Sequence, residues 1–241
     1  MNPMRRSVVG TVAVSIAVAL TANPASAATK ISWVGPTPPG EGGQIYLTTS
    51  TINNSPLEAS SRIYTSFGTS VPSGYMGVQA RLFKSGVLCQ MTDYVYNAGT
   101  TNQQTTNTWG HCGSGSYNSH GFVKYWTGDG YGDFLTFPTD PLSYAAPSGR
   151  ASAAPTKVTS TRNSRGQTLG TADNARSDEE LPDLVAAFDS TGQQGYIRKA
   201  DLTGTDPVSP AAALRKRSRS GTSVAVFTAD GTTRIGALKV N

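Results

Sequence analysis

The sequence predicts a mainly β protein with two parts: an antiparallel β-sandwich or barrel with one disulfide at residues 44–145, and a small α+β module at 158–241. Short stretches of alternating apolar and polar residues, separated by Gly-rich turns, predict the first part because such stretches form strands that pair through tight turns. Residues 146–157 are rich in alanine and proline, so we expect them to form a linker between the two parts.

Residues 1–27 have the pattern of a cleavable secretory signal peptide. Arg5 and Arg6 precede an apolar run at 8–20, and small residues follow at 25–27. The run is too short to cross a bilayer as a resident helix, so we expect no membrane attachment after cleavage. The mature protein is then released, or held at the cell wall by non-covalent contacts. Cleavage would lower the formal charge from +5 to +3, which predicts no nucleic-acid partner.

The first β part begins after a leader at 28–43, whose prolines and glycines predict disorder. Residues 75–84 alternate as a half-buried strand, and the turn Lys84-Ser85-Gly86 joins them to a second strand at 87–96 in an antiparallel hairpin. The polar run at 97–108 predicts a loop, because it has almost no apolar side chain to bury. Two further strands are expected at 120–126 and 133–137.

Cys89 and Cys112 are the only cysteines in the chain. An even pair in an exported protein predicts a disulfide, which would close the loop that follows the hairpin. A zinc site with His111 or His120 is the alternative, but the spacing matches no common zinc motif.

The second part is predicted as hairpin, helix and hairpin. Apolar runs at 184–188 and 195–200 give the first hairpin. Ser209 before Pro210 is a typical helix start, with the helix continuing to Arg217. Strands at 224–229 and 234–240 surround an Asp-Gly turn and complete the module.

The last third of the chain resembles a module that recurs in secreted proteins of actinobacteria. The resemblance depends on Gly166-Gln167-Thr168, on 182–185, on 195–198, and on the ending with Asp230-Gly231 and Ile235-Gly236. Leu169 departs from the pattern, where an aromatic residue is expected. The resemblance implies export and the domain boundary, and it implies no biochemical activity. Residues 28–145 resemble no family.

Candidate catalytic residues are few. His111 and His120 are the only histidines, and with Asp93, Asp129 or Asp133 either could form an acid/base pair. Neither lies in a motif that fixes such a geometry, so loop and strand histidines are the simpler interpretation.

Two other patterns have simpler explanations than a ligand. The loop at 127–133 holds two carboxylates that could bind calcium, but the downstream acid of a calcium loop is missing, and turn geometry accounts for its glycines. The basic run at 215–219 suits the end of a helix, although contact with anionic wall polymers is the functional alternative. No phosphate-binding loop, redox cysteine pair or coenzyme motif is present, so we predict no cofactor and no metal.

Aromatic residues suggest a binding surface. Eleven of the chain's aromatic residues lie between Tyr94 and Tyr144, and a core is their ordinary use. Exposed Trp and Tyr beside amide-rich loops are typical of glycan or protein recognition. The candidate binding residues are Asn102, Trp109, Tyr117, Trp126 and Tyr131.

The sequence therefore predicts a secreted, non-enzymatic protein whose first domain binds a cell-wall polymer, another glycan or an extracellular protein. A small secreted hydrolase that uses His111 or His120 is one alternative. A secreted inhibitor or toxin-like effector is the other.

Overall fold

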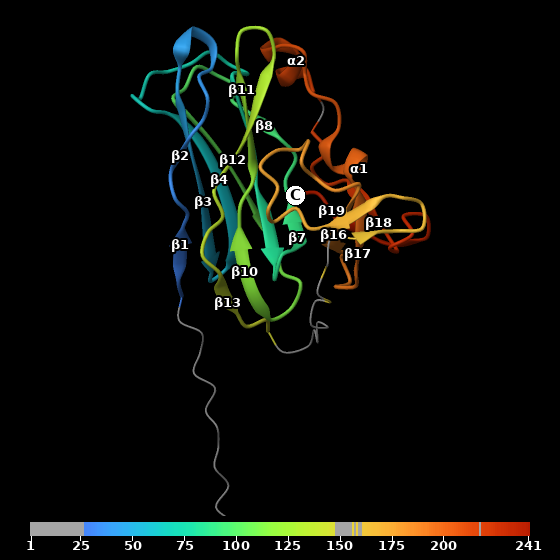
Figure 1. The fold of residues 1–241 in the computed structure, drawn as a ribbon. Coiled ribbons are helices and arrows are strands. Elements are labelled where there is room, and N and C mark those ends of the chain that lie inside the picture. Colours follow the sequence, from blue (N-terminus) through green and yellow to red (C-terminus); the bar gives the residue numbers. More distant parts are fainter. Residues whose placement is uncertain (1–26, 148–155, 157, 159–160, 217) are drawn as a thin grey trace, which may run out of the picture.

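The computed structural model describes residues 27–147, 156, 158, 161–216 and 218–241 (Figure 1). The chain is mainly β, as predicted, and Cys89 and Cys112 form the predicted disulfide. Nearly all of the predicted signal peptide and most of the predicted linker lie outside the described residues. Within the described part, no helix has the length and apolar character needed to span a bilayer.

The first sheet has five strands and forms the left side of the molecule in Figure 1. Its order is β1-β3-β4-β9, and β2 also pairs with β3. All of these pairings are antiparallel. The strands are β1 (Thr29–Ile31), β2 (Gly35–Pro36), β3 (Tyr46–Asn54), β4 (Leu57–Thr65) and β9 (Gln103–Trp109).

Two segments of this sheet correct the sequence predictions. The leader at 28–43 is not disordered: it holds β1, β2 and the short 3-10 helix η1 (Glu41–Gly43), because its backbone pairs along β3 at the sheet edge, where prolines are tolerated. The predicted loop at 97–108 contains β9. Its threonines favour extended backbone, and one face of an edge strand needs no apolar side chain.

The second sheet has four strands in the order β12-β11-β5-β8. Two of them match the strands predicted at 120–126 and 133–137, with shifted ends. The strands are β5 (Met76–Gln79), β8 (Val95–Tyr96), β11 (Phe122–Trp126) and β12 (Tyr131–Leu135).

The third sheet has ten strands and joins the two predicted parts of the chain. Its main path is β13-β10-β6-β7-β16-β17-β18-β19; β15 also pairs with β16, and β14 pairs with β15. The junction is a parallel pairing of β7 with β16, at Leu88 and Ala187. The strands are β6 (Arg81–Lys84), β7 (Val87–Met91), β10 (Gly115–Ser119), β13 (Leu142–Tyr144), β14 (Thr161–Arg162), β15 (Thr168–Gly170), β16 (Leu184–Phe188), β17 (Gln194–Arg198), β18 (Ser223–Phe227) and β19 (Arg234–Lys239).

The predicted half-buried strand at 75–84 divides at Ala80 into β5 and β6, which belong to different sheets. Both of its faces are buried, including Gln79 and Arg81. The hairpin itself is confirmed, because β6 pairs with β7 through the turn at Ser85-Gly86, and β5 pairs with β8. Alternation predicted the extended backbone, but it could not reveal that a second layer covers the polar face.

In the C-terminal part, β16, β17, α2 (Pro210–Arg215), β18 and β19 follow the predicted order, while β14, β15 and α1 (Lys199–Thr203) are elements that the sequence did not predict. Helix α2 begins as predicted, with the Ser209 hydroxyl accepting a hydrogen bond from the Ala212 amide. The strand predicted at 195–200 stops at Arg198, where helix α1 begins. In Figure 1 these elements, coloured orange to red, lie on the side opposite β1.

Packing between the layers leaves one face of the first sheet outside the core. The inward residues of β3 and β4 pack on both other sheets: Ile52 and Ala59 join Leu82, Cys89 and Phe188, while Ile63 joins Met76 and Val123. The opposite side of β16 packs with β17, with α1 and with the loop that precedes β16. The residues in this contact are Val185, Ile197, Leu202, Ala172 and Leu181. The outward residues of the first sheet have no such cover, and they form the candidate site.

Candidate functional site: the outer face of the first sheet

The candidate site is the outward side of β3, β4 and β9, which we call the exposed face. The register places four residues from each strand in four cross-strand rows. All of them are half-buried or exposed, in contrast to the buried residues that alternate with them on β3 and β4. The rows are Asn53-Glu58-Trp109, Thr51-Ser60-Asn107, Thr49-Arg62-Thr105 and Leu47-Tyr64-Gln103.

Cross-strand hydrogen bonds order the polar side chains of the exposed face. Arg62 Nη2 donates to Gln103 Oε1 at 2.5 Å, and its guanidinium lies 4.4 Å from the centre of the Tyr64 ring. Asn107 donates to the Glu58 carboxylate. Such pairs stabilise neighbouring strands and limit side-chain motion, so a ligand would meet donors and acceptors that are already in place.

Aromatic side chains stand at the margins of the exposed face. Trp109 ends β9 and is 59% exposed. Ile31 pairs with Thr51, and a further backbone bond joins Ser32 to Ser50, so Trp33 comes beside Thr49 at the opposite edge. Trp33 is 83% exposed, and Phe67, just beyond the end of β4, is 90% exposed. Aromatic rings this exposed offer flat apolar contact that the fold itself does not use.

The exposed face is broad and close to electrically neutral. Gln103 and Trp109 are six residue steps apart on β9, which corresponds to about 20 Å along the strand, and four neighbouring strands span about 14 Å. The charged groups in the four rows are one acid, Glu58, and one base, Arg62, and each has a partner on the face. The surface therefore suits a long ligand without net charge.

The structure separates the five residues that sequence reasoning proposed for binding. Trp109 lies on the exposed face, and Asn102 is exposed just before β9, where its side-chain amide donates to the Gly68 carbonyl. Tyr117 and Trp126 are buried in the core and cannot contact a partner. Tyr131 is half-buried, with its hydroxyl donating to the Gly74 carbonyl and its ring against Trp126.

Tyr117 has a structural role at the disulfide. Its hydroxyl accepts a hydrogen bond from the Cys112 amide at 2.9 Å and donates to the Gly113 carbonyl at 2.5 Å. It therefore holds the loop that Cys112 attaches to β7.

The two histidines lie in different surroundings. His120 is wholly buried and stacks on Phe83 with ring centres 4.5 Å apart. Burial, with the nearby Arg81 charge, lowers the pKa of His120 to about 3, so it stays neutral at physiological pH. His111 is half-buried, and its Nδ1 accepts a hydrogen bond from the Gly113 amide at 3.1 Å.

The aspartates considered as catalytic partners are used elsewhere. Asp129 accepts a hydrogen bond from the Thr127 hydroxyl within its own turn. Asp133 forms an ion pair with Lys124 at 2.6 Å, and Asp93 pairs with Arg219. The neighbours of the His120 ring are other residues: Phe83, Phe122 and Asp173, whose Oδ1 is 3.8 Å from His120 Nε2.

A second cluster of polar groups is buried between the sheets and the C-terminal loops. Arg81 donates to Asp178 at 3.0 Å, and the Tyr94 hydroxyl donates to the same carboxylate. Lys124 lies 2.6 Å from Asp133 and 2.7 Å from Asp206. Burial would lower the pKa of Lys124, but the two carboxylates raise it above its ordinary value, so Lys124 is charged. Most of these groups bond one another, as in a structural network, although the buried Arg81 Nη1 has no hydrogen-bond partner among the described residues.

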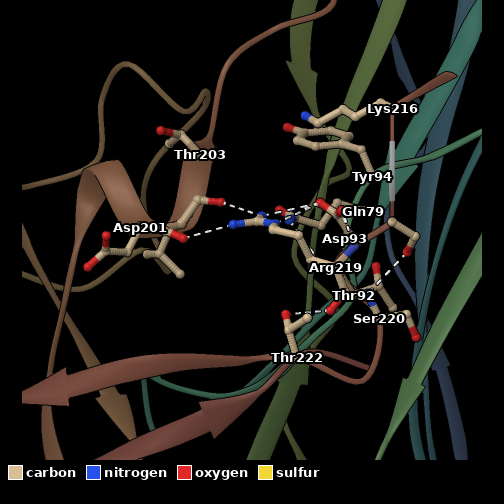
Figure 2. A network of polar contacts seen from close by, with 12 residues as sticks. Gln79, Thr92, Asp93, Tyr94, Asp201, Thr203, Lys216, Arg219, Ser220 and Thr222 are labelled. Atoms are coloured by element: carbon tan, nitrogen blue, oxygen red, sulfur yellow. Dashed lines mark hydrogen bonds and ion pairs between the residues drawn. The ribbon is translucent and has the colours of Figure 1, made fainter. Parts of the chain in front are cut away.

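Figure 2 shows a neighbouring network around Arg219, the last residue of the basic run. Its guanidinium bonds the Asp93 carboxylate and the backbone carbonyls of Asp201 and Leu202. Its backbone amide also donates to Asp93, at 2.9 Å. Arg219 thus connects the segment after β7 to α1, and this contact accounts for one of the charges that the sequence left open to an anionic partner.

Sequence reasoning missed most of the exposed face because each strand looked unremarkable alone. The runs at 46–54 and 57–65 alternate between apolar or small residues and polar ones, and this alternation is the signal that could have found them. The rows themselves depend on long-range pairing of β9 with β4, which local pattern does not encode.

A comparison of the chain with protein-family models, with curated proteins and with solved structures finds no match.

Proposed function

We propose that this protein is a secreted, non-enzymatic protein that binds a glycan chain on the exposed face. The observation that carries the proposal is the row pattern itself: hydroxyl and amide groups fill the middle, and Trp109 and Trp33 stand at opposite edges. A fold that needed these residues only for stability would not leave two tryptophans uncovered. The disulfide supports export, because such bonds persist in oxidising compartments.

The chemistry of the exposed face favours an uncharged, extended polysaccharide. Pyranose rings with equatorial hydroxyls have apolar flat sides, which stack on indole rings, and polar edges, which hydrogen-bond to amides and hydroxyls. With Glu58 and Arg62 already paired, the exposed face offers no surplus charge for a polyanion. A β-1,4-linked chain, as in cellulose or chitin, has this shape and charge.

The test is a depletion assay with the mature protein, residues 28–241, on microcrystalline cellulose and on chitin. The proposal predicts retention on at least one of them. Trp109→Ala and Trp33→Ala should each weaken it at least tenfold, about 1.4 kcal/mol or more, because each removes a stacking ring. Val208→Ala is the matched control, since Val208 is 83% exposed but lies between α1 and α2.

Other outcomes would point elsewhere. Retention that the tryptophan variants share with the wild type would contradict the exposed face as the site. Capture of a culture protein in place of polysaccharide would favour the inhibitor or effector hypothesis. Turnover of a polysaccharide, abolished by His111→Ala, would favour the hydrolase.

A further inference from the structure

A cavity of about 330 Å³ opens beside Trp109, and we call it the Trp109 pocket. It lies between the end of β9, the loop that holds Cys112, the turn between β16 and β17, and the end of the chain after β19. Its volume is at the lower end of the range for small-molecule sites, which corresponds to one or two sugar rings. Trp109 therefore belongs both to the exposed face and to this pocket.

The pocket holds polar groups in fixed positions. The side-chain amide of Asn241 donates to Gln90 Oε1 at 3.1 Å, to Thr108 Oγ1 at 2.7 Å and to the Trp109 carbonyl at 3.1 Å. These three bonds fix the amide plane. Asn241 Oδ1 is then left as an acceptor and Gln90 Nε2 as a donor, and neither makes a hydrogen bond to another described residue.

We propose that the Trp109 pocket binds the terminal sugar residue of a glycan chain that lies on the exposed face. The proposal rests on the proposed function and adds a preference for chain ends. The indole of Trp109 supplies the flat apolar wall, and Gln90 Nε2 and Asn241 Oδ1 supply a donor and an acceptor for neighbouring hydroxyls. Ser190 and Lys239 also line the pocket.

The disulfide belongs to this arrangement. Cys112 lines the Trp109 pocket, and its bond to Cys89 on β7 holds the loop at 110–113 in place. The same β7 carries Gln90. Cleavage of the disulfide should therefore loosen the pocket more than the exposed face, whose rows depend on sheet pairing.

The experiment compares short and long ligands. Affinity for cellohexaose and chitohexaose, which are rich in chain ends, is measured by calorimetry, and affinity for insoluble cellulose and chitin by depletion. Gln90→Glu keeps the oxygen that accepts from Asn241 and exchanges the free donor for an acceptor, so folding should be preserved. Ser190→Ala is a second variant at an exposed position, and Tyr64→Ala is the matched change on the exposed face.

The pocket predicts that Gln90→Glu weakens hexasaccharide binding about tenfold, which is the loss of one well-placed hydrogen bond, and changes polysaccharide retention less than twofold. Reduction of the disulfide should also weaken hexasaccharide binding more than polysaccharide retention. Tyr64→Ala should weaken both hexasaccharide and polysaccharide binding. Unchanged hexasaccharide affinity in Gln90→Glu and in reduced protein would contradict the Trp109 pocket as the site of the terminal sugar, while leaving the proposed function intact. Absence of binding to every ligand by the wild type would overturn both.

Discussion

At the scale of single residues, buried charged groups are the feature that composition conceals. Arg81 and Lys124 are both almost completely buried, and carboxylates reach them from loops far away in the sequence. Asp178 is central, because it accepts from Arg81 and from Tyr94 and lies 3.9 Å from Lys124. Removing one member of such a cluster leaves a buried charge that neither a partner nor solvent compensates.

Asp178→Ala should therefore lower the free energy of unfolding by about 3 to 5 kcal/mol. Chemical denaturation at neutral pH measures the change. The neighbouring Glu179 is exposed, so Glu179→Ala should stay within about 0.5 kcal/mol of the wild type. Equal effects of the two substitutions would show that the buried ion pairs contribute little to the free energy of unfolding.

His120 should make the protein sensitive to acid. In the unfolded chain it binds a proton near pH 6.5, but in the folded protein only near pH 3. Between these values the unfolded state holds more protons, so the free energy of unfolding falls as the pH is lowered, by at most about 5 kcal/mol.

A His120→Phe variant removes this contribution while keeping an aromatic ring beside Phe83. Denaturation of both proteins at pH 7 and at pH 4 gives the comparison. The difference in stability should shift in favour of the variant at pH 4. An unchanged difference would mean that His120 takes up its proton in the folded state.

At the scale of elements, the sequence predicted the strands whose runs are rich in apolar residues, and it missed the alternating β3 and β4 and the polar β9. Residues 87–91, 122–126 and 184–188 appear as strands because their runs are apolar and β-branched or aromatic. The polar β9 was predicted as a loop, because local pattern cannot reveal that β4 offers it a partner. One third of the exposed face, the part that β9 supplies, was invisible for this reason.

The hairpin between β6 and β7 is the element whose turn the sequence located best. Ser85 and Gly86 both have positive φ, 49° and 83°, as a two-residue turn between twisted strands requires. Glycine adopts this conformation without strain, whereas other residues pay for their Cβ atom.

Gly86→Ala should destabilise the protein by about 1 to 2 kcal/mol. A Cβ atom at Gly86 would meet nothing closer than 3.8 Å, so the cost is conformational and not a clash. Thermal unfolding measures it, with Gly130→Ala as control, because a Cβ there meets no atom within 4 Å. A loss in Gly130→Ala equal to that in Gly86→Ala would contradict this explanation.

At the scale of the whole molecule, the two predicted parts share one sheet. The pairing of β7 with β16 continues the hydrogen-bonded order from one part to the other, and the core around Val185 includes Phe83, Leu88 and Phe122. The bonds from Arg81 to Asp178 and from Arg219 to Asp93 cross the same boundary. Composition predicted a linker at 146–157, and it could not show what packs across it.

The protein should accordingly unfold in one cooperative transition. Differential scanning calorimetry tests this, with the disulfide intact, by comparing the calorimetric and van't Hoff enthalpies. Equal values are expected from a shared core. Two resolved transitions, or a van't Hoff enthalpy well below the calorimetric one, would mean that the parts unfold independently.

The central claim, that a glycan chain lies on the exposed face, is tested most directly by oxidative footprinting of the chain's three tryptophans. Trp33 and Trp109 are exposed at the margins of the exposed face, and Trp126 is buried, so the protein contains its own reference. The account predicts that saturating cellohexaose or chitohexaose slows oxidation of Trp33 and Trp109 severalfold and leaves Trp126 unchanged. Binding of either hexasaccharide without protection of Trp33 and Trp109 would contradict it.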